Sequence, residues 1–261
     1  MQGYRPSLIK IIGWEIFSPP FLCDKLGLRK IMIKPFFSWI LPIKNESLSL
    51  SQLISEVASA SGKKSFEIIA VNDASVDNSL SVLRQLQKIY PQLKIINFMT
   101  HIGKWAALSA GFKKAKADIL ITIDSDLQDD PAQVSRLLSR LNHGHDIVSG
   151  WRRHRKDPYY KIWLSDMGSK LLGFRDLNSS FKIYRRQVLD VLPQAGTTFR
   201  FSLLFARKMG YKIAEVPIRH RPRLYGKSKF GIIKYTRILY DLSLILLLFS
   251  GSGRLTPREK S

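Results

Sequence analysis

The sequence predicts an α/β fold with a doubly wound, mostly parallel sheet, and two observations support this. Short apolar runs alternate with stretches of helical periodicity from residue 36 onward, as in proteins built from βαβ units. Polar residues follow several of the apolar runs, where open α/β sheets place their ligand crevice. The chain of 261 residues is long enough for one such domain with appendages.

The first half of the chain contains three strand–helix units. Strands are expected at residues 36–42, 66–71 and 93–98. Apolar residues recur at helical spacing over 50–58 and 80–89, and an alanine-rich helix is expected over 104–117. Ser75 would cap the second helix. Lys104 is interpreted as a surface residue at the start of the third.

One apolar run, Ile119–Ile123, ends on two carboxylates, Asp124 and Asp126. A run without polar alternation is typical of a strand buried on both faces. Carboxylates this close raise each other's pKa unless a cation neutralises them. Oxygen ligands suit Mg²⁺ or Mn²⁺, and Gln128 would add a neutral oxygen. The alternative is a solvated turn, but the place between a buried strand and a capped helix favours the metal site.

A helix is expected directly after this pair. Asp130 would be its N-cap, Pro131 its first residue, and Gln133 would complete a capping box. A fifth strand, residues 146–149, is expected to end at Gly150.

The remaining elements are less regular. The sequence predicts a basic loop at 151–156, an amphipathic helix at 159–172, a polar turn and short strand at 176–186, a helix at 199–209, an edge strand at 211–218 and a final amphipathic helix from 230. We therefore expect an appendage over 1–35, the main domain over 36–230, a membrane-proximal helix over 231–250 and a polar tail over 251–261.

Charge is distributed unevenly along the chain. Residues 151–261 hold 24 Lys and Arg against 7 Asp and Glu, a net +17, whereas residues 1–150 hold 18 against 13, a net +5. The second part should face phosphate groups or an anionic membrane. The single Cys23 excludes a disulfide framework. The longest apolar stretch, Leu239–Phe249, falls short of the roughly 20 residues that span a bilayer, and residues 1–35 do not read as a secretory signal.

Several motifs together resemble a known family. They are LPIKNE at 41–46, VNDAS at 71–75, GKWAALSAG at 103–111, DSDLQDDP at 124–131, DLNSSFKIYRR at 176–186 and VPIRHRPRLYGKSKFG at 216–231. The set resembles the inverting glycosyltransferases with the A-type fold. Within these, it is most similar to the polyprenyl-phosphate glycosyltransferases, such as the dolichyl-phosphate mannosyltransferases and their bacterial undecaprenyl-phosphate relatives. The combination is specific, although each motif alone would be weak.

The resemblance implies roles for the matching residues. The residues implied to bind the nucleotide sugar are Pro42, Asn45, Glu46, Asp73 and Asp124. The metal ligands would be Asp124, Asp126 and Gln128. The residues implied to bind the acceptor or its phosphate are Arg152, Arg153, Asn178, Ser179, Ser180, Arg221 and Lys229. Asp126, Asp176 and Arg219 would be catalytic. Asp176 as a general base has a structural alternative, a turn or cap carboxylate paired with Arg175 or Lys182.

The implied activity is metal-dependent, inverting transfer of a hexose from a nucleotide sugar, of the GDP-mannose or UDP-glucose type, to a polyprenyl phosphate. The implied cofactor is Mg²⁺ or Mn²⁺, and the implied location is the cytoplasmic face of a membrane, bound peripherally. An anchoring partner or self-association is left open. The alternatives are a transferase with a non-lipid acceptor and a degenerate, non-catalytic basic protein that binds membrane or nucleic acid. We expect no nucleic acid, because the sequence contains no recognition helix or aromatic ladder.

Overall fold

The computed structural model of the chain describes residues 34–153, 172–192, 199 and 201–225. The chain divides into two units, Met1–Ile33 and Lys34–Ser261, and all described residues belong to the second. The predicted final helix, the polar tail and Lys229 lie outside the described residues, as do most of the predicted appendage and of the 159–172 helix. Within the described part, no helix combines the length and the apolar character needed to cross a bilayer.

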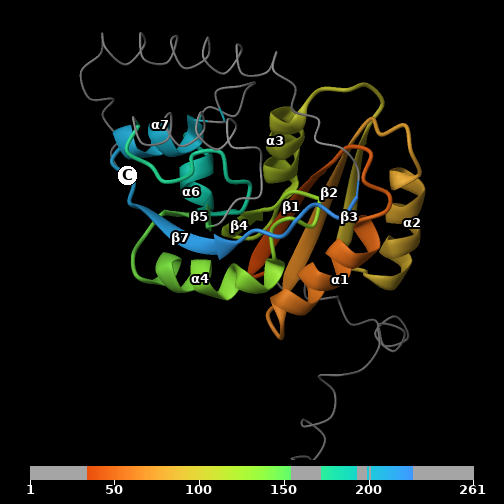
Figure 1. The fold of residues 1–261 in the computed structure, drawn as a ribbon, viewed down its shortest axis with the longest axis horizontal. Coiled ribbons are helices and arrows are strands. Elements are labelled where there is room, and N and C mark those ends of the chain that lie inside the picture. The colour runs from red at the N-terminus through yellow and green to blue at the C-terminus, as the bar shows by residue number, and fades with distance from the viewer. Residues whose placement is uncertain (1–33, 154–171, 193–198, 200, 226–261) are drawn as a thin grey trace, which may run out of the picture. The chain divides into compact units, whose positions relative to one another are not determined.

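A seven-stranded sheet forms the centre of the fold, with strand order β3-β2-β1-β4-β6-β5-β7 (Figure 1). The strands are β1 (Phe37–Ile43), β2 (Phe66–Asp73), β3 (Leu93–Phe98), β4 (Ile119–Thr122), β5 (Ile147–Arg153), β6 (Lys182–Arg185) and β7 (Ile213–Arg219). Of these seven, β6 alone runs antiparallel to its neighbours, β4 and β5. The predicted mostly parallel α/β sheet is therefore confirmed.

Helices cover both faces of the sheet, as a doubly wound fold requires (Figure 1). One face carries α1 (Leu50–Ser61), α2 (Ser79–Ile89) and α4 (Val134–Asn142), the last preceded by the short helix η4 (Pro131–Gln133). The other face carries α3 (Lys104–Lys114), α6 (Arg186–Leu189) and α7 (Ser202–Lys208). Strand β1 contributes to both cores because its side chains alternate: Trp39 and Leu41 pack in the first core and Ile40 in the second.

Two glycines permit close approaches that define this packing. A Cβ on Gly111 of α3 would lie 2.3 Å from Ile40 Cγ2 of β1, so the helix packs directly on β1. A Cβ on Gly150 would lie 2.7 Å from Ile218 Cδ1. Gly150 was expected to end β5, and this is wrong: the strand continues to Arg153 because the missing side chain lets Ile218 of β7 pack against it.

Two predicted caps are also wrong. Helix α2 begins at Ser79, and the Ser75 hydroxyl instead accepts a hydrogen bond from Asn45 N at 2.9 Å. Asp130 does cap η4, accepting from Ala132 N at 3.0 Å. The Gln133 side chain, however, does not complete a capping box. Its amide nitrogen donates to Arg219 O, and its amide oxygen accepts from Arg219 N on β7. A tertiary partner displaces the local one in both cases.

Candidate active site

The two carboxylates of the Asp-Ser-Asp sequence lie in the loop that leaves β4. Asp124 is partly exposed, and Asp126 is buried. The loop is fixed from both sides of Ser125: its hydroxyl donates to Pro42 O of β1 at 3.0 Å, and its carbonyl accepts from the Ser49 hydroxyl at 2.6 Å. The strand ends β1 and β4 therefore hold the acidic pair in a defined position at one edge of the sheet.

Lys104 is the partner of Asp124. Its Nζ lies 2.5 Å from Oδ1 and 2.8 Å from Oδ2. Burial alone would raise the pKa of Asp124, but the charges of Lys104 and Arg152 and the Ser180 hydroxyl together lower it below its usual value. Asp124 is therefore ionised at neutral pH. Lys104 does begin α3, as expected, but its side chain is only partly exposed and pairs with the acidic site instead of facing solvent alone.

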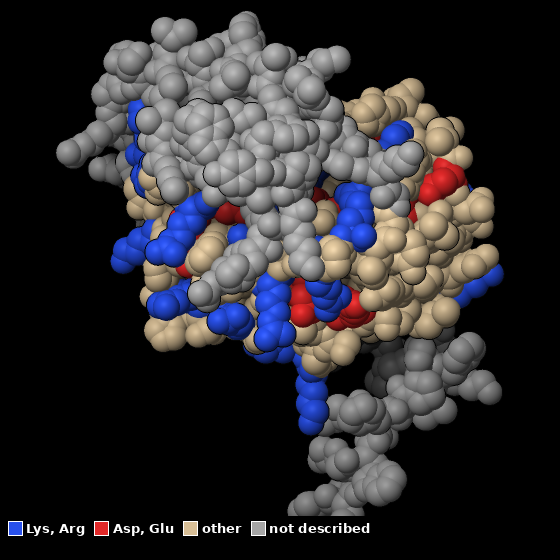
Figure 2. All heavy atoms as spheres, in the orientation of Figure 1, with Lys and Arg blue, Asp and Glu red and all other residues tan. Residues whose placement is uncertain are grey.

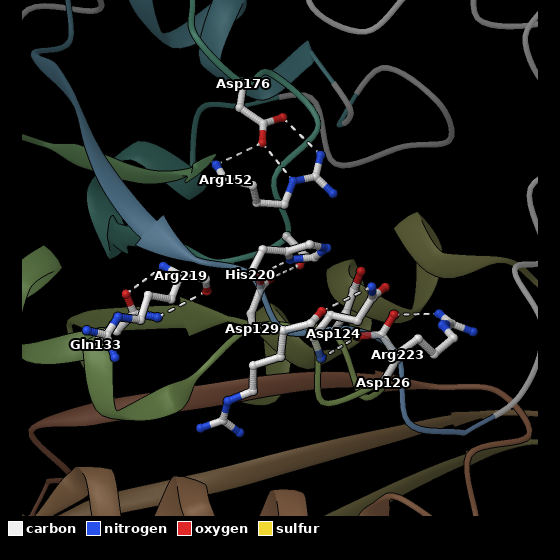
Figure 3. A network of polar contacts seen from close by, with 12 residues as sticks. Asp124, Asp126, Asp129, Gln133, Arg152, Asp176, Arg219, His220 and Arg223 are labelled. Carbon is white, nitrogen blue, oxygen red and sulfur yellow. Dashed lines mark hydrogen bonds and ion pairs between the residues drawn. The ribbon is translucent and has the colours of Figure 1, made fainter. Parts of the chain in front are cut away.

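Asp126 is held differently. Arg223 Nη2 lies 2.5 Å from its Oδ2 (Figure 3). Gln128 N donates to its Oδ1 at 3.2 Å. Burial and then the neighbouring charge of Asp124 raise the pKa of Asp126 above its usual value, although Arg223 opposes this. The two carboxylates therefore repel each other in spite of Lys104 and Arg223, and a further positive charge beside them would be favourable.

The two carboxylates are suitable ligands for a hard divalent cation that is bound together with a substrate. The described residues hold no cluster of three or more His, Cys, Asp or Glu suited to a metal. The protein thus offers two carboxylates, and Mg²⁺ commonly takes one or two carboxylates with waters and substrate phosphates as its other ligands. The Gln128 amide nitrogen donates to Arg221 O at 3.5 Å, so the ligand role expected for Gln128 stays a prediction.

A chain of buried polar groups links this loop to two other parts of the fold (Figure 3). The Asp129 carboxylate accepts from the Ser180 hydroxyl at 2.6 Å and lies 3.2 Å from His220 Nδ1. Asp129 and His220 also form a backbone bridge. The chain connects the loop after β4, the turn before β6 and the end of β7, so these three segments are positioned together.

The late basic segment is residues 219–225, which begin at the last residue of β7. Arg219 is exposed, and its backbone is bonded by Gln133. Arg221 Nη1 lies 2.8 Å from Glu56, and its Nη2 lies 2.9 Å from Asp130. Burial lowers the pKa of Arg221, but these two carboxylates raise it above its usual value overall. Figure 2 shows Lys and Arg side chains gathered around a small group of Asp and Glu side chains on one face.

Asp73 ends β2 and holds the approach to α3. Its buried carboxylate accepts from Ile102 N at 2.8 Å and Gly103 N at 3.0 Å, and it lies 2.8 Å from His101 Nδ1. These bonds fix the start of the helix and hence Lys104. The nucleotide-binding role expected for Asp73 stays a prediction.

The other residues expected to bind the nucleotide lie at the end of β1. Asn45 has a left-handed backbone, with φ +52°, and its side chain accepts from Val76 N at 2.8 Å. Glu46 N donates to the Ser79 hydroxyl at 3.0 Å. Hydrogen bonds therefore hold the loops that follow β1 and β2 together beside Pro42, where the resemblance implies that the nucleotide sugar binds.

Asp176 is paired with Arg152 in a fork. Arg152 Nε and Nη2 donate to its two oxygens at 2.7 and 3.0 Å (Figure 3). Glu215 of β7 accepts from the backbone N of Arg175 and of Asp176 and so fixes the same turn. A buried carboxylate held by an arginine is a poor proton acceptor, so this geometry favours a structural role for Asp176, with Arg152 as its partner in place of the expected Arg175 or Lys182. The backbone of Arg153 ends β5.

The turn 178–180 lies between Asp176 and β6. Asn178 is exposed, Ser179 is buried and Ser180 is partly buried. Thr122 Oγ1 of β4 donates to Ser180 O at 2.7 Å. Lys182 is buried behind the turn and donates to the carbonyls of Leu177, at 3.3 Å, and of Ser179. Burial and the charges of Lys104 and Arg152 lower the pKa of Lys182 to about 8, although Asp176 and Asp124 oppose this.

The sequence interpretation missed four residues of this site: Lys104, Lys182, His220 and Arg223. Three of these, all except Lys104, stand in the motifs at 176–186 and 216–231, next to residues that were selected, but no rule of spacing singles them out. Lys104 stands in the motif at 103–111. Lys104, His220 and Arg223 are identified only by their tertiary partners, and Lys182 is identified by its burial.

The fold and the acidic pair at the end of β4 define a class: the A-type glycosyltransferases. The sequence model "Glycosyl transferase family 2" matches residues 38–205, and the chain belongs to this family. The chain is 30% identical over 216 residues to the undecaprenyl-phosphate 4-deoxy-4-formamido-L-arabinose transferase of Edwardsiella ictaluri and 29% identical over 214 residues to that of Proteus mirabilis. These alignments cover 79% and 78% of this chain, and the chain spans 66% of each relative's length.

Solved structures share the fold. The mannosyltransferase PcManGT of Pyrobaculum calidifontis, in complex with GDP-Man and Mn²⁺, aligns with a TM-score of 0.63 at 18% identity, covering 85% of this chain and 66% of that one. The glucosyl-3-phosphoglycerate synthase of Mycobacterium tuberculosis, in complex with Mn²⁺, UDP and glucosyl-3-phosphoglycerate, aligns with a TM-score of 0.63 at 18% identity, covering 82% and 79%. At this identity the likeness establishes the fold alone.

Proposed function

We propose that the protein transfers a sugar from a nucleotide sugar to a polyprenyl phosphate with inversion at the anomeric carbon. The observation that carries this proposal is the acidic pair, fixed at the end of β4 and faced by Lys104 and Arg223. The names of the relatives support the acceptor, since both act on undecaprenyl phosphate. The sugar donors we favour are of the GDP-mannose or UDP-glucose type. The names of the relatives suggest a further candidate donor, a nucleotide-linked 4-formamido pentose.

The chemistry follows from the charges of the site. An oxygen of the acceptor phosphate forms the new bond to the anomeric carbon while the bond to the nucleoside diphosphate breaks. The acceptor phosphate is already ionised, so the reaction needs no general base, in agreement with the paired state of Asp176. A divalent cation on Asp124 and Asp126 would stabilise the charge of the leaving diphosphate. Lys104 and Arg223 are the protein's own cations at the same place.

The remaining assignments belong to the same proposal. The donor would lie along the ends of β1 and β2, over Pro42, Asn45, Glu46 and Asp73. The lipid phosphate would enter from the side of Arg152 and the turn 178–180, with Arg219 exposed beside it. The net +17 of residues 151–261 supports a peripheral position at the cytoplasmic face of an anionic membrane. We keep the domain limits predicted from the sequence, with the transferase domain over 36–230.

The test is an incubation of the full chain with Mn²⁺ or Mg²⁺, a short polyprenyl phosphate and a panel of UDP- and GDP-sugars that includes a 4-formamido pentose donor. We expect glycolipid from one donor, and none with EDTA or in the Asp126→Asn variant. Asp118→Asn is the matched control, because Asp118 is an exposed carboxylate at the opposite end of β4, paired with Lys34. Transfer to a soluble acceptor but not to the lipid would refute the proposed acceptor.

A further inference from the structure

Exposed hydrophobic side chains gather at the edge of the sheet that carries the acidic pair. In the described part of the chain nine large hydrophobic side chains are exposed, and six of them follow the carboxyl ends of strands: Leu48, Val76, Met99, Ile102, Leu224 and Tyr225. The strands concerned, β1, β2, β3 and β7, run in the same direction, so their carboxyl ends share one edge. Single exposed hydrophobic residues are ordinary, but their concentration at one edge indicates an interaction surface.

The most exposed of these side chains form a row that follows the order of the strands. Met99, 88% exposed, follows β3, Val76, 89% exposed, follows β2, and Leu48, 71% exposed, follows β1. These three strands lie side by side (Figure 1). The late basic segment reaches the loop after β4, which is the next strand, so Leu224 extends the row. We call these four side chains the apolar row.

Hydrogen bonds hold the loops of the apolar row in place. Val76 N donates to the Asn45 side chain at 2.8 Å, and Ser47 N donates to Asp77 Oδ2 at 3.0 Å, so the loops after β1 and β2 support each other. The loop after β3 is bonded to Asp73 at the end of β2. The row is therefore ordered before any partner arrives, and binding would cost little conformational entropy.

The surroundings of the row favour a lipid surface over a protein partner. A serine precedes both Leu48 and Val76, and a threonine follows Met99, so the row consists of separate apolar tips among polar groups. A protein interface has a continuous, fully buried core, whereas apolar side chains between polar ones suit the headgroup region of a bilayer. The exposed Arg219 and the net +17 of residues 151–261 favour anionic lipids.

We propose that the apolar row docks the protein on the surface of an anionic bilayer, so that the edge with the acidic pair faces the lipid. A polyprenyl phosphate is held in the bilayer by its tail, and a site at this edge would meet its phosphate at the level of the headgroups. The choice of a lipid partner rests on the proposed function. The contact falls on the loops after β1, β2 and β3, which lie outside the basic part of the chain.

The first test measures binding of the full chain to vesicles and needs no turnover. Partition onto an equal mixture of phosphatidylcholine and phosphatidylglycerol is measured by sedimentation for the wild type and for Val76→Thr, Met99→Gln and their combination. Each single variant should weaken partition about threefold and the combination about tenfold, because less apolar surface leaves water. Ile89→Gln is the matched control: Ile89 is 68% exposed at the end of α2, away from this edge, and its loss should change partition less than about 1.5-fold.

The second test locates the contact. Cys23 is the only cysteine, so Cys23→Ser allows a polarity-sensitive dye to be attached through Met99→Cys or, as the control, Ile89→Cys. Emission of the dye at position 99 should shift to the blue when vesicles are added, and emission at position 89 should not.

Partition that is absent, or unchanged in the combined variant, would overturn the inference. So would a dye at position 99 that stays in water on bound vesicles, or one that shifts without vesicles as the protein concentration rises, which would assign the row to a second copy of the chain. Vesicle binding requires no donor, so its failure is distinct from a failure to form glycolipid, which would refute the proposed function.

Discussion

The buried ammonium of Lys182 predicts a specific dependence of stability on pH. Its pKa is about 8 in the folded protein against 10.5 for an ordinary lysine, because burial disfavours the charged form. Between these two values the folded protein has released the proton while the unfolded chain still holds it. Stability therefore rises with pH in this window relative to a protein without the lysine. A shift of 2.5 units corresponds to about 3 kcal/mol over the whole window.

The experiment compares the wild type with Lys182→Met by denaturant unfolding at pH 7, 8, 9 and 10. The difference in unfolding free energy should move in favour of the wild type by about 1.4 kcal/mol per pH unit above pH 8. Lys212→Met, at an exposed position before β7, controls for the change in net charge. A difference in unfolding free energy between wild type and variant that stays constant from pH 7 to 10 would refute the lowered pKa of Lys182.

Three further variants test other parts of the structure. Gly111→Ala places a Cβ 2.3 Å from Ile40 Cγ2 and should lower the unfolding free energy by about 1–3 kcal/mol, measured by the denaturant midpoint. Glu67→Gln should cost about 1.5–3 kcal/mol at pH 7 and much less at pH 3: burial raises its pKa, but its partners lower it overall, so its contribution is lost as the pH falls through the folded value. Arg223→Gln removes the counter-ion of Asp126 and should tighten Mn²⁺ binding about fivefold without nucleotide, measured by calorimetry.

The control for the metal measurement is Arg221→Gln. Arg221 lies in the same late basic segment, but it pairs with Glu56 and Asp130 instead of the acidic pair. Its loss should leave the Mn²⁺ constant within about twofold. An equal gain in both variants would indicate a general effect of net charge, and no gain in either would show that Arg223 does not compete with the cation.

The central strands were predictable because their signal is local. The runs that become β1, β2 and β4 are mostly apolar, and such runs are typical of strands buried on both faces, as these three are. The direction of β6 was not predictable, since a short strand after a polar turn has the same pattern in either orientation. Gly150 shows the same limit: its role depends on Ile218, which only the pairing of β5 with β7 brings beside it.

The acidic pair was predictable for a similar reason, because both carboxylates follow the apolar run Ile119–Ile123 within three residues. Their cations were not. Lys104 precedes Asp124 by 20 positions, and Arg223 follows Asp126 by 97. Composition shows only that cations are abundant in the second part of the chain. The three-dimensional pairing decides which of them meet the carboxylates and which, like Arg221, are held by other acids.

The charges of the site indicate how its ligands should bind. Each carboxylate of the acidic pair already has one cation, so a divalent metal alone would add two positive charges beside Lys104 and Arg223. A diphosphate alone would add negative charge beside Asp124 and Asp126. The charges of the metal and the diphosphate largely cancel when both are bound. The ion pairs of Lys104 with Asp124 and of Arg223 with Asp126 can then stay or change partners without leaving a buried charge uncompensated. Metal and nucleotide should therefore each strengthen the binding of the other by the same factor, as linkage requires. Equal Mn²⁺ affinities with and without UDP or GDP would show that this balance does not govern the site.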